Sequence, residues 1–302
     1  MNCYPWHQPQ MDRLLKGNFQ SLLLVSGPGQ GVDRFAQALT EHLMCQTQNA
    51  CGQCQSCQWI EQGGHPDVFA VRPEGAAHAH KIDAMREIAE SAHTTTHQGG
   101  RRVVQLFEAE RMNRAGANGL LKVLEEPPAS TRFVLTSTLP GSLPATILSR
   151  CRQVRLPSAP EDLQWLDDLV PASPERDQAL LMTQAPDTLL HLLQHPDELA
   201  KQVRWRTALI DALAGRGDLT GLVNAAKPLA LLQCLDVWYQ VVVEQAKTHA
   251  QDAAVLKRFV LFQQRLQRER QPVLEQVALN GPAMVRALGG LWLRVAPPAT
   301  TH

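Results

Sequence analysis

The sequence carries no excess of charge of either sign. Lysine plus arginine equal aspartate plus glutamate at 29 residues each. A chain without net charge has no overall positive field that would attract a phosphate backbone. We therefore expect any contact with nucleic acid to be local or to be made through partner proteins.

The sequence also lacks long apolar runs, a targeting segment, internal repeats and low-complexity stretches. No apolar run approaches the roughly 20 residues that cross a bilayer, and residues 1–7 have neither the basic start nor the apolar stretch of a signal peptide. Apolar residues make up 44% and charged residues 19% of the 302 residues, which is a globular composition. These features predict a soluble protein of the cytoplasm with two or three domains.

The first half of the chain alternates short apolar runs with amphipathic segments. Phe35, Leu39 and Leu43 recur every four residues and predict a helix from about Val32 to Met44. The expected strands are Ser21–Val25, Val68–Val71, Val103–Phe107, Phe133–Thr136 and Val154–Leu156. Strands that alternate with helices in this way predict an α/β fold, a parallel sheet covered by helices.

Strand signals fade after Pro157, and the remaining chain has helical periodicity interrupted by prolines. We predict three domains: an α/β domain at residues 1–157, a small helical domain at 158–200 and a larger all-helical domain at 201–302.

A glycine loop, Ser26–Asp33, follows the first expected strand. A working phosphate loop has the form G-x-x-x-x-G-K-[ST], in which backbone amides cradle the phosphates, lysine neutralises their charge and the hydroxyl binds magnesium. Counted back from Gly31, Ser26 replaces the first glycine, Val32 replaces the lysine and Asp33 replaces the hydroxyl residue. The loop keeps Gly31 but lacks the other three signature residues.

The two substitutions after Gly31 oppose phosphate binding. Val32 cannot neutralise a triphosphate, and the carboxylate of Asp33 repels one. An acidic residue in the first helical turn still stabilises the helix by about 0.3–1 kcal/mol, so the loop with Gly27 and Gly29 can keep its shape without a ligand. We expect no ATP binding; a glycine-containing turn that never bound nucleotide remains the simpler interpretation of the loop alone.

A second catalytic element is also incomplete. In an active ATPase of this type, the strand at Val103–Phe107 would end in an Asp-Glu pair that supports magnesium and orients the attacking water. This sequence has Phe107 and Glu108 there. With Phe107 in place of the aspartate, a magnesium ion would lack a second supporting residue.

Four of the seven cysteines lie within 13 positions, at Cys45, Cys51, Cys54 and Cys57. Four thiolates on a compact loop suit the tetrahedral coordination of structural zinc. In a reducing compartment this clustering favours a metal over disulfides, although free or redox-active thiols remain the alternative. His65 is a possible substitute ligand that we interpret as a turn residue.

Three linked motifs carry a family resemblance: the segment Leu120–Pro128, the triplet Ser149–Cys151 and the cysteine cluster before the second strand. Together they resemble the AAA+ clamp-loader subunits of bacterial DNA polymerase III, over residues 4–156. Gamma and tau subunits carry an intact phosphate loop. Val32, Asp33 and Phe107 therefore point to the delta-prime branch, as does the Tyr4-Pro5-Trp6 start.

The resemblance assigns roles to several residues. It implies that Arg150 is an arginine finger, reaching in trans into a neighbour's ATP site; a surface or salt-bridging arginine is the alternative. Thr136 falls at a sensor position, where without nucleotide we expect ordinary packing or hydrogen bonding. Glu125 and Glu126 precede two prolines and receive no chemical role.

The resemblance also implies an assembly. The helical domains would be a lid and a collar, and the collar would join gamma/tau and delta subunits in a five-membered ring that loads the sliding clamp on primed DNA. Two alternatives stay open: an ATP-hydrolysing gamma/tau-like subunit, and a zinc-dependent nucleic-acid-binding module. Structural zinc is the only cofactor that the sequence predicts.

Overall fold

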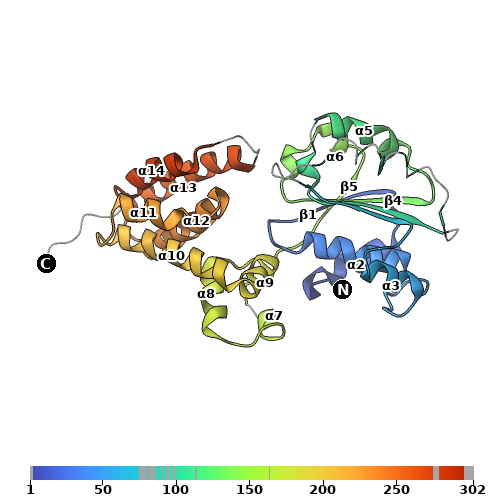
Figure 1. Ribbon diagram of the computed structural model, residues 1–302, viewed down its shortest axis with the longest axis horizontal. Helices are drawn as coiled ribbons and strands as arrows, with labels where there is room; N and C mark the ends of the chain where they lie inside the picture. Colours follow the sequence, from blue (N-terminus) through green and yellow to red (C-terminus); the bar gives the residue numbers. More distant parts are fainter. Residues whose placement is uncertain are drawn as a thin grey trace. The chain divides into compact units, whose positions relative to one another are not determined.

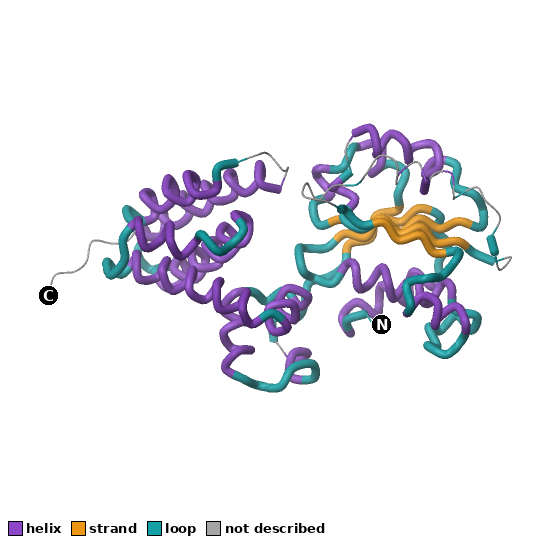
Figure 2. Tube along the Cα trace, in the orientation of Figure 1, coloured by secondary structure: helices purple, strands orange, loops and turns teal. Residues whose placement is uncertain are grey.

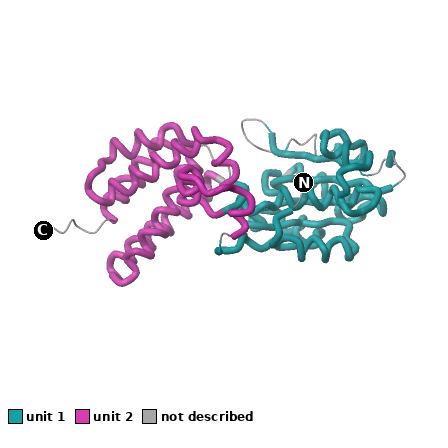
Figure 3. The backbone as a smooth tube through the Cα atoms, turned by 90° about the horizontal axis from the view of Figure 1, so that it is seen from below, with its two compact units in different colours: residues 1–163, 185–187 teal, residues 164–184, 188–302 magenta. Residues whose placement is uncertain are grey.

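The computed structural model describes residues 3–74, 80, 85, 87–88, 90, 92, 96–97, 100–112, 114–162, 164–274 and 279–295. The chain divides into two compact units (Figure 3). Unit 1 comprises residues 1–163 and 185–187, and unit 2 comprises residues 164–184 and 188–302. Among the described residues, no helix is both long and apolar enough to cross a membrane.

Unit 1 contains one parallel sheet of five strands in the order β2-β3-β4-β1-β5 (Figure 1). The strands are β1 (Ser21–Val25), β2 (Val68–Val71), β3 (Arg102–Leu106), β4 (Thr131–Ser137) and β5 (Arg152–Arg155). Strand β1 pairs with β4 on one side and β5 on the other. The predicted α/β class and parallel sheet are confirmed.

Helices cover both faces of this sheet (Figure 2). Leu22 and Leu24 pack with Phe35 of α2 (Val32–Met44) in one core cluster. The alternate residue Leu23 packs with Leu120 of α5 (Arg114–Glu125) in the other cluster. Burial on both faces explains why β1 is an uninterrupted apolar run. The remaining helices of unit 1 are η1 (Pro5–His7), α1 (Gln8–Lys16), α3 (Gln55–Glu61), η2 (Ala109–Arg111), α5 (Arg114–Glu125), η3 (Pro140–Ser142) and α6 (Ala145–Leu148).

The predicted bounds of β1, β2 and α2 are confirmed. Strand β3 begins one residue before its predicted start, and β4 and β5 each begin two residues before theirs. In β3 the additional residue is Arg102, whose side chain is 1% exposed and forms an ion pair with Asp67. A charged residue gives no apolar signal, so the sequence did not place it in a buried strand. Strand β5 begins at Arg152 because its backbone pairs with Leu22.

All the regular secondary structure in the described residues of unit 2 is helical. Its elements are α7 (Gln164–Asp167), α8 (Pro174–Met182), α9 (Pro186–Gln194, whose first two residues belong to unit 1), α10 (Pro196–Leu213), α11 (Leu219–Ala226), α12 (Leu231–Thr248), α13 (Ala253–Leu274) and α14 (Gly281–Trp292). Three fully buried tryptophans, Trp205, Trp238 and Trp292, form its centre, with edge-to-face contacts at centroid distances of 5.3 and 5.9 Å. Helix α10 runs through the predicted boundary at residue 200, and the three-domain division remains a prediction.

Candidate nucleotide loop, cysteine cluster and arginine

The glycine loop connects the end of β1 to the start of α2. Gly31 has a φ of 86° and precedes the first helical residue, Val32. A Cβ atom at Gly31 would lie 2.6 Å from Cε2 of Tyr4, closer than van der Waals contact allows. The loop therefore needs glycine here for its backbone conformation and for the approach of the tyrosine ring.

Asp33, the residue at the hydroxyl position, is held by donors from the chain itself. Thr136 Oγ1 donates to its Oδ1 at 2.8 Å, and Arg72 Nη1 donates to its Oδ2 at 2.9 Å. Both carboxylate oxygens thus have partners within the protein. Through these bonds Asp33 joins α2 to β4 and to the end of β2.

Phe107, at the end of β3, belongs to the same network. The guanidinium carbon of Arg72 lies 3.7 Å from the centroid of the Phe107 ring, in a cation–π contact. Glu108 donates its backbone N–H to Thr136 Oγ1 at 3.0 Å, and its carboxylate lies 3.5 Å from Arg111 Nε. The structure thus joins the loop to Phe107, Glu108 and Thr136. Arg72 is the member that sequence reasoning missed.

A pocket of about 260 Å³ lies over the loop at the carboxyl ends of the strands, where open parallel sheets bind ligands. Its lining residues are Pro28, Gly29, Gly31, Val32, Asp33, Glu108, Thr136, Thr138 and Asp187. Three of these are acidic and none is basic. Polyphosphate would therefore meet like charge from the pocket lining, and the nearby Arg72 and Arg111 are already paired with Asp33 and Glu108.

Asp187 is the third carboxylate of this pocket, and no sequence motif indicated it. Its backbone N–H donates to the carbonyl of Gly29 at 2.9 Å, and its Oδ1 accepts from the Tyr4 hydroxyl at 2.7 Å. Arg34 Nε lies 3.6 Å from the same oxygen. Burial, together with the bond to Asp187, raises the pKa of Tyr4, so the phenol remains protonated and can donate.

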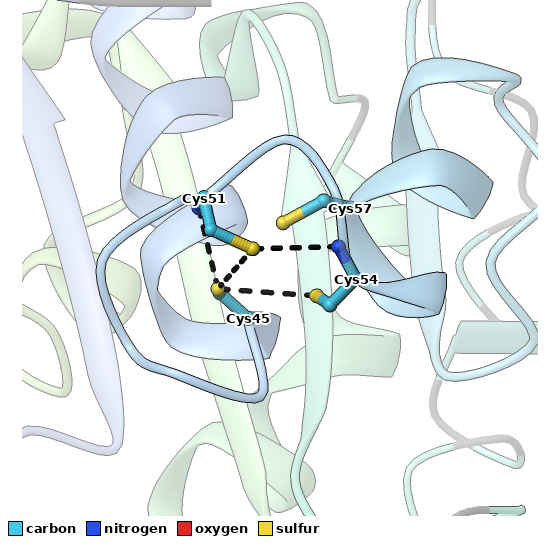
Figure 4. Close-up of side chains that lie close together, drawn as sticks. All are labelled: Cys45, Cys51, Cys54 and Cys57. Atoms are coloured by element: carbon cyan, nitrogen blue, oxygen red, sulfur yellow. Dashed lines mark hydrogen bonds between the residues drawn. The ribbon is translucent and has the colours of Figure 1, made fainter.

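The four clustered cysteines converge (Figure 4). Their sulfur atoms all lie within 4.8 Å of one another, with Cys45 Sγ at 3.6 Å from Cys51 Sγ and 3.9 Å from Cys54 Sγ. A tetrahedral zinc ion with 2.3 Å bonds to sulfur would set its ligands about 3.8 Å apart. Cys57 completes the group from helix α3. The cluster can therefore hold a metal ion.

Backbone geometry around the cluster supports this arrangement. The loop from Cys45 to Cys54 contains three residues with positive φ: Gln48, Ala50 and Gly52. For the two that are not glycine this conformation costs on the order of 1 kcal/mol each. The amide N–H groups of Cys51 and Cys54 point at the sulfurs of Cys45 and Cys51, both at 3.4 Å. Such amide donors stabilise thiolates.

Two thiols of the cluster differ in acidity. Burial alone would raise the pKa of Cys45, but hydrogen bonds from the Thr47 side chain and nearby backbone amides outweigh it and lower the pKa to about 5. Burial and the neighbouring sulfurs raise the pKa of Cys57 to about 12. Four thiols crowded together therefore do not all ionise without a cation among them.

Arg150 lines neither the loop pocket nor the cysteine cluster. It follows α6 and precedes β5. Its Nη1 donates to the carbonyl of Thr146 at 3.0 Å, and its Nη2 forms an ion pair with Glu125 Oε1 at 3.0 Å. Two of the three motifs that carried the family resemblance, Leu120–Pro128 and Ser149–Cys151, thus meet through this pair. Glu125, which received no chemical role from the sequence, contacts the predicted finger.

His65 is placed as a turn residue and is not part of the cysteine cluster. Its Nδ1 accepts from the backbone N–H of Asp67 at 3.0 Å, and its ring packs edge-on against Trp59. The group of potential ligands consists of the four cysteines alone among the described residues.

Comparison with known proteins identifies the family. Residues 10–160 match the family described as DNA polymerase III, delta subunit. The DNA polymerase III subunit delta' of Escherichia coli (strain K12) is 36% identical over 214 residues, which cover 67% of this chain and 64% of that protein. The corresponding protein of Pseudomonas aeruginosa is 30% identical over 98% of this chain and 99% of its own length. The chain belongs to the DNA polymerase III delta-prime family.

A solved structure shares the fold of this chain. It is a DNA polymerase III gamma subunit-related protein from Thermotoga maritima, with a TM-score of 0.50 and 15% identity. The match covers 95% of this chain and 99% of that chain. At this identity the likeness concerns the fold, which agrees with the predicted AAA+ class.

Proposed function

We propose that the chain is the delta-prime subunit of a DNA polymerase III clamp loader, that it does not bind or hydrolyse ATP, and that it lends Arg150 to a neighbouring gamma/tau ATPase. In this role it also contacts a delta subunit within a five-membered ring that loads the sliding clamp on primed DNA. Family membership supports the assembly, and the degenerate loop supports the loss of ATPase activity.

One observation carries the proposed inactivity: the carboxylate of Asp33 lies at the phosphate loop, bonded to Arg72 and Thr136. A triphosphate would have to displace these partners and would then face Asp33, Glu108 and Asp187 without a lysine. Phe107 adds no magnesium ligand. The purified chain should show no saturable Mg-ATP binding by calorimetry in the micromolar range. Micromolar affinity would instead favour the gamma/tau-like alternative.

Arg150 is tested in the reconstituted loader by the variant Arg150→Ala. A guanidinium that stabilises charge on the transferred phosphate is worth about 10³-fold or more in turnover at the site it serves. We expect a loss of this size at one site in single-turnover measurements of DNA-stimulated ATP hydrolysis. Arg152→Ala is the matched control. Arg152 lies two positions after Arg150, its side chain is exposed, and the substitution removes the same charge. Equal rates for Arg150→Ala and wild type would exclude the finger.

We propose further that the cysteine cluster holds a structural zinc ion through Cys45, Cys51, Cys54 and Cys57. Four sulfur ligands leave no open position for catalysis, so the ion would fasten the loop between α2 and α3. Elemental analysis should find one zinc per chain. If the purified chain instead binds primed DNA tightly with a steep salt dependence, and loses this binding with the metal, the nucleic-acid-binding alternative gains support.

A further inference from the structure

Glu125 and Arg150 come from segments that are 25 residues apart in sequence. Glu125 is the last residue of α5, which stops before the two prolines at 127 and 128. Arg150 lies two residues beyond the end of α6, and α5 packs against α6. The contact is therefore set by the packing of two helices and not by a local turn.

The guanidinium of Arg150 is held on two sides. Nη1 donates to the carbonyl of Thr146 at 3.0 Å and lies 3.4 Å from Ser149 Oγ, while Nη2 donates to Glu125 Oε1 at 3.0 Å. A flexible arginine has many rotamers, and these contacts select one of them. Removal of the carboxylate would leave one terminal nitrogen without its partner and allow the side chain to sample other rotamers.

The pair leaves the guanidinium able to bind an anion. Arginine has five N–H donors, and the carboxylate of Glu125 accepts from only one terminal nitrogen. The side chain of Glu125 is 58% exposed and that of Arg150 is 26% exposed. An exposed ion pair is weak, so a phosphate of higher charge can share or replace the carboxylate. The arrangement orients the arginine without sequestering it.

We propose that Glu125 is a positioning residue for Arg150, holding its guanidinium in the geometry from which it reaches the phosphate of a neighbouring ATP. This inference rests on the proposed finger function. Glu125 does not itself touch the reacting atoms; it acts by limiting the conformations of Arg150 before the neighbour's nucleotide arrives.

The next residue provides a matched control. Glu126 is also exposed, and its backbone N–H donates to the Lys122 carbonyl at 3.1 Å. No ion pair of its side chain is found in the part of the chain that the structure describes. The variants Glu125→Gln and Glu126→Gln remove the same charge from adjacent positions, and only the first breaks the contact with Arg150.

The test compares four loaders reconstituted with Glu125→Gln, Glu126→Gln, Arg150→Ala and the double variant Glu125→Gln/Arg150→Ala. For Glu125→Gln we expect kcat of DNA-stimulated ATP hydrolysis to fall about fivefold, the size set by an exposed ion pair, with KM for ATP unchanged. Glu126→Gln should match wild type. The double variant should be no slower than Arg150→Ala, because Glu125 acts only through the arginine.

Each other outcome has a distinct meaning. A normal rate with Arg150→Ala would overturn the finger and this inference with it. A slow Arg150→Ala with a normal Glu125→Gln would overturn the positioning role alone. Equal losses with Glu125→Gln and Glu126→Gln, or an additive double variant, would show that the charge acts through a partner surface, which also overturns the inference. Unchanged thermal unfolding of the Glu125→Gln chain excludes misfolding as the cause.

Discussion

The glycine loop and the cysteine cluster both have the backbone of a ligand site. They differ in whether the chain itself supplies partners that balance the charged groups of the site. At the loop, each oxygen of the Asp33 carboxylate has a donor, from Arg72 or Thr136. At the cluster, the sulfurs of four free cysteines converge within 4.8 Å, and two of them accept hydrogen bonds from backbone amides. A site whose charges the chain itself balances has little place for a ligand, whereas four like groups gathered at one point can hold a cation among them.

The cysteine cluster should give the largest effect in tests of this comparison. Cys54→Ser removes one of four ligands. We expect loss of bound zinc and a fall of about 4 kcal/mol in the free energy of unfolding, the stabilisation supplied by a ligand at a thousand times its Kd. Elemental analysis measures the zinc, and urea denaturation in zinc-buffered solution measures the stability.

Cys3→Ser is the control for that experiment, because Cys3 lies outside the cluster. It should keep one zinc per chain and nearly the parental stability. A Cys54→Ser chain that lost its zinc but kept its stability would contradict the comparison, since the cluster would then need no ion to complete it.

The next largest effect is expected at the loop, from Gly31→Ala. The new Cβ would meet the Tyr4 ring at 2.6 Å, and a φ of 86° is unfavourable for alanine. We expect a loss of about 2–3 kcal/mol in unfolding free energy, from left-handed strain and the displaced ring. Gly119→Ala, within helix α5 and with no atom within 4 Å of its Cβ, should be neutral or stabilising. Equal effects would mean that the tyrosine does not constrain the loop.

A smaller effect concerns pH and His80, whose Nε2 donates to the carbonyl of Phe107 at 2.8 Å beside the loop. Burial lowers the pKa of His80 below its ordinary value of 6.5. Below about pH 6.5 the unfolded chain therefore binds the proton more readily than the folded chain does. The free energy of unfolding falls as the pH falls. One pH unit below that value, the loss from one histidine is at most about 1.4 kcal/mol.

Urea denaturation at pH 7.5 and pH 5.5 measures this loss, and His80→Gln should reduce it. His7 and His65 are also buried with lowered pKa values, so part of the pH dependence should remain in the variant. A His80→Gln chain with the full parental pH dependence would show that His80 is not involved.

The smallest effect is expected from the ion pair of Arg72 and Asp33, whose side chains are 47% and 31% exposed. Exposed pairs contribute roughly 0.2–1 kcal/mol. A double-mutant cycle with Arg72→Met and Asp33→Asn should therefore give a coupling near 0.5 kcal/mol in unfolding free energy. A coupling of zero would show that Arg72 does not contribute to the network of contacts around Asp33.

The sequence predicted the sheet and the loop well because both depend on local patterns. Buried strands such as Ser21–Val25 are continuous apolar runs, and the loop is defined by glycine spacing next to a strand. The cysteine cluster was equally predictable from the sequence, because four cysteines at that spacing are typical of a metal site. Predicted bounds failed where charged residues occupy strand positions, as Arg102 does through its buried pair with Asp67.

The contacts that complete the sites could not be predicted, because their partners are distant in sequence. Arg72 lies 39 residues from Asp33, and Asp187 lies 183 residues from Tyr4. An isolated arginine or aspartate has no periodicity or motif that would indicate such a contact. The pairing of Glu125 with Arg150 depends likewise on how two helices pack.

The short segment Ala185–Asp187 has a practical consequence for dissecting the molecule. It belongs to unit 1, although the chain on both sides of it belongs to unit 2. A fragment cut after residue 163 would lose the acceptor of the Tyr4 hydroxyl and the amide that caps the Gly29 carbonyl. The first unit is thus discontinuous in sequence, and a truncation that preserves its loop must extend past residue 187.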